Sequence, residues 1–195
     1  MRLYGFACMQ HEFLPHFAPM IACELPGTGE RRGFNANETI VVGAHFDSRG
    51  SFGYPTAPGA DDDGTGTAVV LAIARSIYEH RLTFSRKVVL ALFAGEEQGL
   101  LGSAWYAKKL KQDKEDVAFM LQIDMIGYRA AGEPMQMARP DKIGLPEASW
   151  LLGNVTNVYV PDLQTRRPGY SVEQISATGK AVYATLLELA GFSFV

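Results

Sequence analysis

The sequence predicts an α/β fold, a three-layer sandwich whose mostly parallel or mixed central sheet is flanked by helices. Two observations lead to this prediction. Residues 39–44 and 87–94 are expected strands whose sequences are almost entirely apolar and contain β-branched side chains, as strands covered on both faces require. Segments with apolar residues at helical spacing follow these runs, and strands that alternate with helices build largely parallel sheets.

Apolar segments bounded by Gly, Pro or polar residues mark the expected strands. A short apolar segment ends at Pro26-Gly27, and a polar, Gly-rich loop follows it. A second loop over 49–60 is rich in Gly, Pro and Ser, and a third is expected over 130–146. The segments expected to form strands are 20–25, 39–44, 87–94, 117–123 and 157–160.

Three helices are predicted from apolar stripes. The first spans 64–80, with Asp63 at the position of an N-cap. The second has its stripe at Leu100, Ala104, Ala107 and Leu110. The third has apolar or small residues spaced by three and four from Val172 to Leu189, and Gly191 is expected to end it.

Length and composition indicate one globular domain over 1–195. The hydrophobic fraction is 47%, the charged fraction 20% and the net charge −3, so nothing favours nucleic acid or a membrane as a partner. Apolar runs are too short to cross a bilayer. Cys8 and Cys23 could form one bridge but no disulfide framework. The segment Met1–Gln10 lacks the long apolar stretch of a signal peptide, so none is expected in this chain.

Acidic residues and a histidine follow the expected strands. His45 and Asp47 come after 39–44, Glu96 and Glu97 come after 87–94, and Asp124 comes after 117–123. A loop with three consecutive Asp residues, 61–63, opens the first helix. Ligands of open α/β sheets bind at the carboxyl ends of the strands, where these side chains are expected to meet.

Clustered carboxylates need a compensating positive charge, and these segments hold no matching run of Lys or Arg. A divalent metal pair would provide that charge, with carboxylate and imidazole ligands suited to zinc or manganese. Each feature alone has an ordinary structural interpretation: turn and capping chemistry for the Asp run, a solvated helix start for Glu96-Glu97. Their convergence on one edge of the sheet favours a metal site.

At these residues the sequence resembles the M28-type zinc exopeptidases, an aminopeptidase group with secreted fungal and bacterial members. The matching segments are VVGAHFDSRG (41–50), PGADDDGTGTA (58–68), ALFAGEEQGLLGS (91–103) and LQIDMIGY (121–128). The resemblance covers about Phe17 to Gly169 and resumes in the last helix. It implies zinc-dependent removal of amino acids from peptide N-termini by a water molecule that two metal ions activate.

The resemblance also implies a role for each matching residue. His45 and Asp124 would bind one zinc ion, Glu97 the other, and Asp62 would bridge both. Glu96 would be the general base, and Asp47 would orient the imidazole of His45. The resemblance further implies a peptide as the substrate, a secreted location and one or two zinc ions here.

One expected ligand, a histidine near the C-terminus of the family pattern, has no counterpart. The remaining histidines, His11, His16 and His80, are not expected to replace it. The chain runs from Tyr170 directly into the final helix where family members have further strands, which predicts an internal deletion near 170–171 and missing sheet strands.

Without the missing histidine, one metal would have the ligands His45, Asp62 and Asp124. The other metal would have only Asp62 and Glu97. Two alternatives to an active aminopeptidase follow: an inactive or mononuclear metal-binding remnant of such an enzyme, and a glutaminyl-cyclase-like enzyme, which would share the fold but use one zinc ion.

Overall fold

The computed structural model describes residues 1–50, 55–128, 146–159 and 172–194. Its central sheet has five strands in the order β1-β2-β5-β3-β6. Strand β3 runs parallel to both β5 and β6, whereas β2 runs antiparallel to β5 and to β1. The sheet is therefore mixed. Its strands are β1 (Ala7–His11), β2 (Met20–Leu25), β3 (Glu38–His45), β5 (Lys87–Phe93) and β6 (Asp116–Gln122).

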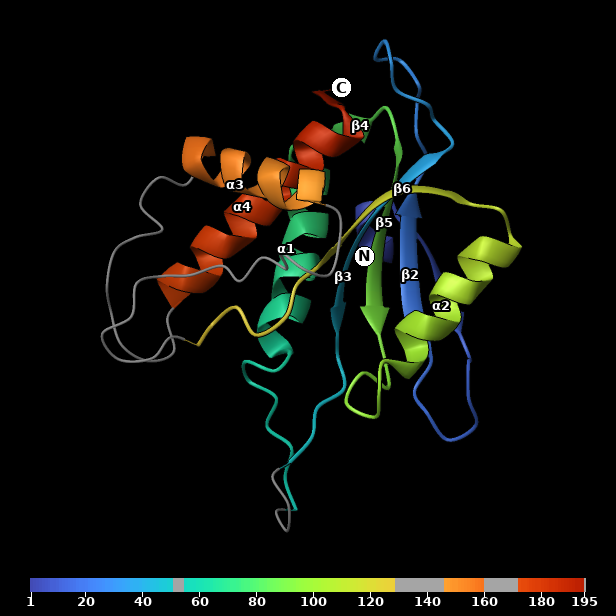
Figure 1. Ribbon diagram of the computed structural model, residues 1–195, viewed down its shortest axis with the longest axis vertical. Helices are drawn as coiled ribbons and strands as arrows, with labels where there is room; N and C mark the ends of the chain where they lie inside the picture. Colours follow the sequence, from blue (N-terminus) through green and yellow to red (C-terminus); the bar gives the residue numbers. More distant parts are fainter. Residues whose placement is uncertain (51–54, 129–145, 160–171, 195) are drawn as a thin grey trace.

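Helices cover the sheet on two sides, as the sandwich prediction requires (Figure 1). Helices α1 (Gly64–Glu79), α3 (Pro146–Tyr159) and α4 (Val172–Ala190) lie on one side. Helix α2 (Leu101–Gln112) lies on the other side. A short 3-10 helix, η1 (Arg2–Tyr4), precedes β1. Among the described helices, none combines the length and apolarity of a membrane span.

The core alternates along each central strand with the period of two expected of a pleated sheet. In β3, Ile40 and Val42 are fully buried and pack with the residues of α1 and α4. Val41 is buried in a second cluster, together with Phe93 of β5 and Tyr106 of α2. Both faces of β3 are thus covered, which explains its uninterrupted apolar sequence.

Helix α1 begins as predicted. The Asp63 carboxylate accepts the backbone N–H of Gly66 at 2.9 Å, so that it caps the helix. Val70, Ile73 and Ile77 are buried against the sheet. The end of α4 is also as predicted, because Gly191 follows Ala190 with a φ of 65°, a conformation that favours glycine.

The prediction of a strand over 157–160 is wrong for 157–159, the part that the structure describes. Residues 157–159 are the last turn of α3, which packs against α4. Leu151, Leu152 and Val155 recur at helical spacing, and Val155 is buried. This amphipathic packing outweighs the β propensity of the valines. The loop predicted over 130–146 lies outside the described residues except for Pro146, which begins α3.

Three short strands are not evident from the sequence. Strand β1 pairs with β2, and the disulfide Cys8–Cys23 joins them at directly opposed positions. The bridge that the sequence left open is therefore formed. Strands β4 (Leu82–Phe84) and β7 (Phe192–Phe194) form a separate antiparallel pair. Three-residue strands carry too little periodicity to be predicted.

Strand β6 lies at an edge of the sheet, and β3 is its only strand partner among the described residues. Its apolar side chains are poorly covered. Val117 is 38% exposed and Met120 45% exposed, although Leu121 is buried.

The disulfide predicts a measurable stabilisation. The two cysteines are 15 residues apart, and closing a loop of that length is worth about 3 kcal/mol. We expect Cys8→Ser to lower the free energy of unfolding in guanidinium by about that amount. Met9→Ser, at an exposed position of the same strand, is the control and should change it by less than about 0.5 kcal/mol. Equal stability of the two variants would contradict the prediction.

A second prediction concerns the junction of β5 and α2. The N–H of Gly102 donates to the carbonyl of Ala94 at 3.1 Å, and a Cβ at Gly102 would overlap that carbonyl oxygen. The backbone on both sides would have to shift. We therefore expect Gly102→Ala to destabilise the protein by about 1–3 kcal/mol in thermal or denaturant unfolding. Ser103→Ala, at the next residue, is the control, and its free energy of unfolding should stay within about 0.5 kcal/mol of that of the parent.

Candidate metal centre

The parallel strands bring the acidic segments to one edge of the sheet. Strands β3 and β5 point the same way and end at the lower edge of the sheet in Figure 1. His45 is the last residue of β3 and is in register with Phe93, the last residue of β5. Glu96 follows β5, and Asp124 follows β6.

His45 lies at the centre of the cluster and is completely buried. Its Nε2 atom is 2.9 Å from Oδ1 of Asp62, 3.8 Å from Oδ1 of Asp124 and 3.9 Å from Oε2 of Glu96. Ligand atoms of His45, Asp62 and Asp124 all lie within 4.8 Å of one another. The side chains of Asp62 and Asp124 are 44% and 40% exposed, so the cluster opens to solvent.

The tautomer of His45 explains what this cluster can bind. Nδ1 lies 3.0 Å from the main-chain carbonyl of Asp47, which can only accept, so Nδ1 carries the hydrogen. Nε2 of the neutral ring then presents a lone pair to the carboxylate oxygens, and it makes no hydrogen bond. A cation among these atoms would remove the repulsion between lone pairs. The donor set therefore fits zinc, which binds imidazole nitrogen and carboxylate oxygen.

Electrostatics favour the same conclusion. Burial lowers the pKa of the His45 imidazole, but the carboxylates of Asp63, Asp124 and Glu96 outweigh burial, and the net pKa is raised. Burial raises the pKa of Glu96 and of Asp124, and neighbouring carboxylates raise it further. The negative charges at this edge thus attract positive charge, as a proton or as a metal ion.

Asp47 contacts the site in two ways. Its carbonyl oxygen, rather than its carboxylate, is the nearer partner of His45 Nδ1, since the carboxylate Oδ1 lies at 3.6 Å. The carboxylate instead accepts the backbone N–H groups of Glu96 and Glu97, each at 3.2 Å. Asp47 therefore joins the loop after β3 to the loop after β5.

Asp63 joins the end of β3 to the start of α1. Its carboxylate accepts the N–H of His45 at 3.2 Å as well as that of Gly66. Burial raises the pKa of this carboxyl to about 7, although these two N–H groups act against the rise. The peptide bond between Asp62 and Asp63 is cis.

Glu97 lies beside the three-residue cluster rather than within it. Its side chain is 10% exposed, and Oε2 lies 3.6 Å from Nε of Arg49. This contact could not be predicted from local sequence, because Arg49 lies in another loop. The other histidines are not part of the cluster formed by the described residues. His80 Nδ1, for example, lies 2.9 Å from the Ser76 carbonyl at the far end of α1.

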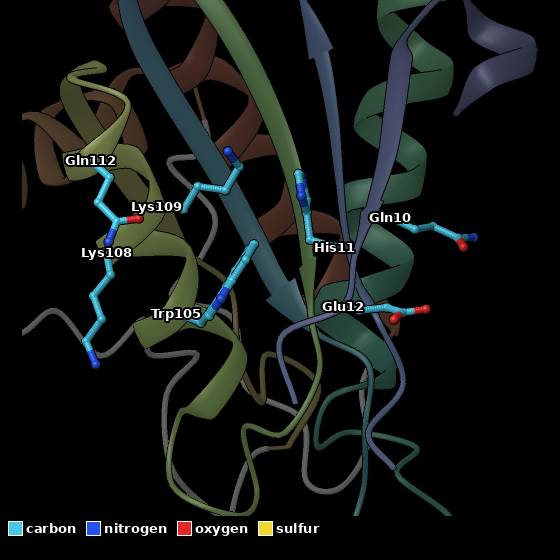
Figure 2. Close-up of a pocket in the computed structure, with 7 residues that line it drawn as sticks. All are labelled: Gln10, His11, Glu12, Trp105, Lys108, Lys109 and Gln112. Carbon is cyan, nitrogen blue, oxygen red and sulfur yellow. The ribbon is translucent and has the colours of Figure 1, made fainter. Parts of the chain in front are cut away.

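A pocket of about 500 Å³ lies elsewhere, between β1 and α2 (Figure 2). His11 and Trp105 face one another in it, with ring centres 5.5 Å apart. Gln10 and Glu12 point to the other side of the strand, and Lys109 is paired with Asp113 at 2.6 Å. None of the residues that line this pocket belongs to the carboxylate cluster.

Known proteins resemble the chain in sequence and in fold. Residues 22–172 match the model of peptidase family M28. Leucine aminopeptidase 1 of Fusarium vanettenii is 30% identical over 162 residues, which cover 76% of this chain and 41% of that protein. Leucine aminopeptidase 1 of Ajellomyces dermatitidis is 41% identical over 99 residues, or 48% of this chain and 26% of that protein. The chain thus spans less than half the length of these curated relatives.

The solved structures share the fold at low sequence identity. LapB from Legionella pneumophila has a TM-score of 0.78 and 21% identity, covering 97% of this chain and 61% of that one. BSAP, a zinc aminopeptidase from Bacillus subtilis, has a TM-score of 0.65 and 19% identity, covering 88% of this chain and 50% of that one. Glutaminyl cyclase from Fimbriiglobus ruber has a TM-score of 0.69 and 14% identity, covering 94% and 82%. Because the family match covers most of the sequence, the chain belongs to peptidase family M28.

Proposed function

We propose that the chain is a zinc-dependent exopeptidase of the aminopeptidase type, which hydrolyses the N-terminal peptide bond of its substrate. The observation that carries the proposal is the convergence of His45, Asp62 and Asp124, with Nε2 of His45 left without a hydrogen bond among carboxylate oxygens. Three protein ligands with an open side are the usual arrangement of a catalytic zinc site. Zinc held there supplies Lewis acidity, which polarises a carbonyl and lowers the pKa of water.

Glu96 is the residue best placed to move protons. Its carboxylate lies 3.9 Å from His45 Nε2, beside the cluster, and its side chain is 26% exposed. A raised pKa makes this carboxylate a stronger base, suited to accept the proton of the attacking water and pass it to the leaving amine. Asp47 would act on the same step indirectly, because it binds the N–H of Glu96 and orients the ring of His45.

The number of metal ions is the second part of the proposal. The first position has three ligands, His45, Asp62 and Asp124. The second position would have Asp62 and Glu97 alone, and Glu97 already lies beside the guanidinium of Arg49. Two protein ligands next to a positive charge bind a divalent ion weakly. We therefore propose one tightly bound zinc ion and, at most, a weak second one in this chain.

The substrate and location are proposed from the relatives and the disulfide. The curated relatives are leucine aminopeptidases, so a peptide with an N-terminal leucine is the first substrate to test. The disulfide Cys8–Cys23 suits an oxidising compartment, in agreement with a secreted location. The deletion predicted near 170–171 lies outside the described residues and stays a prediction.

Two alternatives are separable by experiment. An inactive remnant would keep the fold and the metal without turnover. A glutaminyl-cyclase-like enzyme would cyclise an N-terminal Gln peptide without cleaving it. The fold shared with the glutaminyl cyclase of Fimbriiglobus ruber permits this second alternative but does not favour it, because that likeness at 14% identity concerns the fold alone, whereas the sequence matches are to leucine aminopeptidases.

The metal assignment predicts a stoichiometry. Native mass spectrometry with excess zinc should find one ion on the folded parent chain. The His45→Ala variant should carry no zinc ion, because the substitution removes the proposed ligand at the centre of the cluster. His80→Ala, at an exposed position at the end of α1, is the matched control and should keep the ion. Two firmly held ions would contradict the proposed weakness of the second position, and none would overturn the metal site.

The role of Glu96 predicts a loss of turnover without loss of metal. With a leucine amide substrate, we expect Glu96→Gln to lower kcat by about 10²–10⁴-fold, the usual contribution of a general base. Its zinc content should equal that of the parent chain. The exposed Glu79→Gln variant controls for the change of charge. A parent chain that binds zinc but leaves the substrate intact would favour the inactive remnant.

A further inference from the structure

The turn that follows β6 carries Asp124, and it is held from outside rather than by its own residues. We call residues 124–128 the Asp124 turn. The side chains of Met125 and Tyr128 are exposed, and Ile126 is the one apolar side chain of the turn that packs against the hydrophobic core. Met125 has a φ of 47°, which is unfavourable for a residue other than glycine. Such a conformation persists only where neighbouring groups enforce it.

Gln174 holds the turn from one side. This residue lies in the first turn of α4 and is only 3% exposed. Its side-chain amide donates to the carbonyl of Ile126 at 3.1 Å and to the carbonyl of Tyr128 at 3.0 Å. An amide group has two N–H donors, one for each carbonyl, and a carboxylate or a thioether of similar length has none.

Asp61 and Thr65 hold the turn from the other side. The carboxylate of Asp61 accepts the N–H of Gly127 at 2.7 Å, and the hydroxyl of Thr65 accepts the N–H of Ile126 at 3.3 Å. The same hydroxyl donates back to Asp61. Asp61 directly precedes Asp62, so one hydrogen-bond network joins the loop that carries Asp62 to the turn that carries Asp124.

We propose that Gln174 is a positioning residue of the metal site. By closing the Asp124 turn against the loop of Asp61, it sets the carboxylate of Asp124 opposite His45 and Asp62. The inference rests on the proposed function for the identity of the metal, but the hydrogen bonds of the clamp are all between protein groups. It assigns to α4, which contributes no ligand to the cluster of described residues, control over the affinity of that cluster.

The substitution that tests the clamp is Gln174→Met, which keeps the length of the side chain and removes both donors. Gln174→Asn is the second variant, since it keeps an amide but withdraws it by one methylene group. The matched control is Thr185→Val on the same helix. Thr185 is also buried, but its hydroxyl donates to Ala181 within α4 and not to the turn.

The first readout needs no metal. Amide hydrogen exchange of the metal-free protein should show the amides of Ile126 and Gly127 exchanging at least about tenfold faster in Gln174→Met than in the parent. Gln174→Asn should show a smaller increase in the same amides, and Thr185→Val should show none. Unchanged exchange in both Gln174 variants would overturn the clamp, whatever the zinc measurements find.

The second readout is the dissociation constant for zinc, measured by competition with a chromogenic chelator. Loss of a residue that orients a ligand typically weakens metal binding by about 10–100-fold, and we expect that range for Gln174→Met. The cobalt-substituted variant should also show a shifted visible spectrum, because the carboxylate of Asp124 would move. Equal affinity and spectrum in the parent and the variant would overturn the positioning role alone. A parent chain that binds no zinc would instead overturn the proposed function, and the role with it.

Discussion

The parallel pairing of β3 with both of its neighbours is the constraint on which the candidate site depends. It brings the carboxyl ends of β3, β5 and β6 to one edge, so residues almost 80 positions apart in sequence meet in one cluster. The register places His45 level with the end of β5. Because both faces of β3 are buried, a slip by one residue would turn Val41 and Val42 to the wrong layers and move His45 out of the cluster.

The central fold was predictable because its signals are local and strong. The apolar runs of β3 and β5, the stripe of α1 and the cap at Asp63 each follow from a few neighbouring residues. The C-terminal part of α3 was not predictable in this way, since Val155 and Val158 favour a strand locally and the packing on α4 decides the outcome. Strand β1 depends on a partner and a disulfide outside its own segment.

The same distinction applies to the site. Clustering of His45, Asp62 and Asp124 was predictable, because parallel strands meet at one edge. The contacts that hold these residues were not. Gln174 reaches the Asp124 turn across 46 to 48 residues, and the main-chain carbonyl of Asp47 is closer to His45 than its carboxylate is. Sequence patterns identify donors and acceptors, but only the folded backbone decides which of them meet.

The exposed edge of the sheet has a consequence for the colloidal behaviour of the chain. Strand β6 presents Val117 and Met120 to solvent, and its sequence contains neither proline nor lysine, the residues that commonly discourage the addition of another strand. Its one acidic residue, Asp116, is the first residue of the strand. Among the described residues this edge is open, so self-association through β6 is expected to grow with protein concentration despite the net charge of −3.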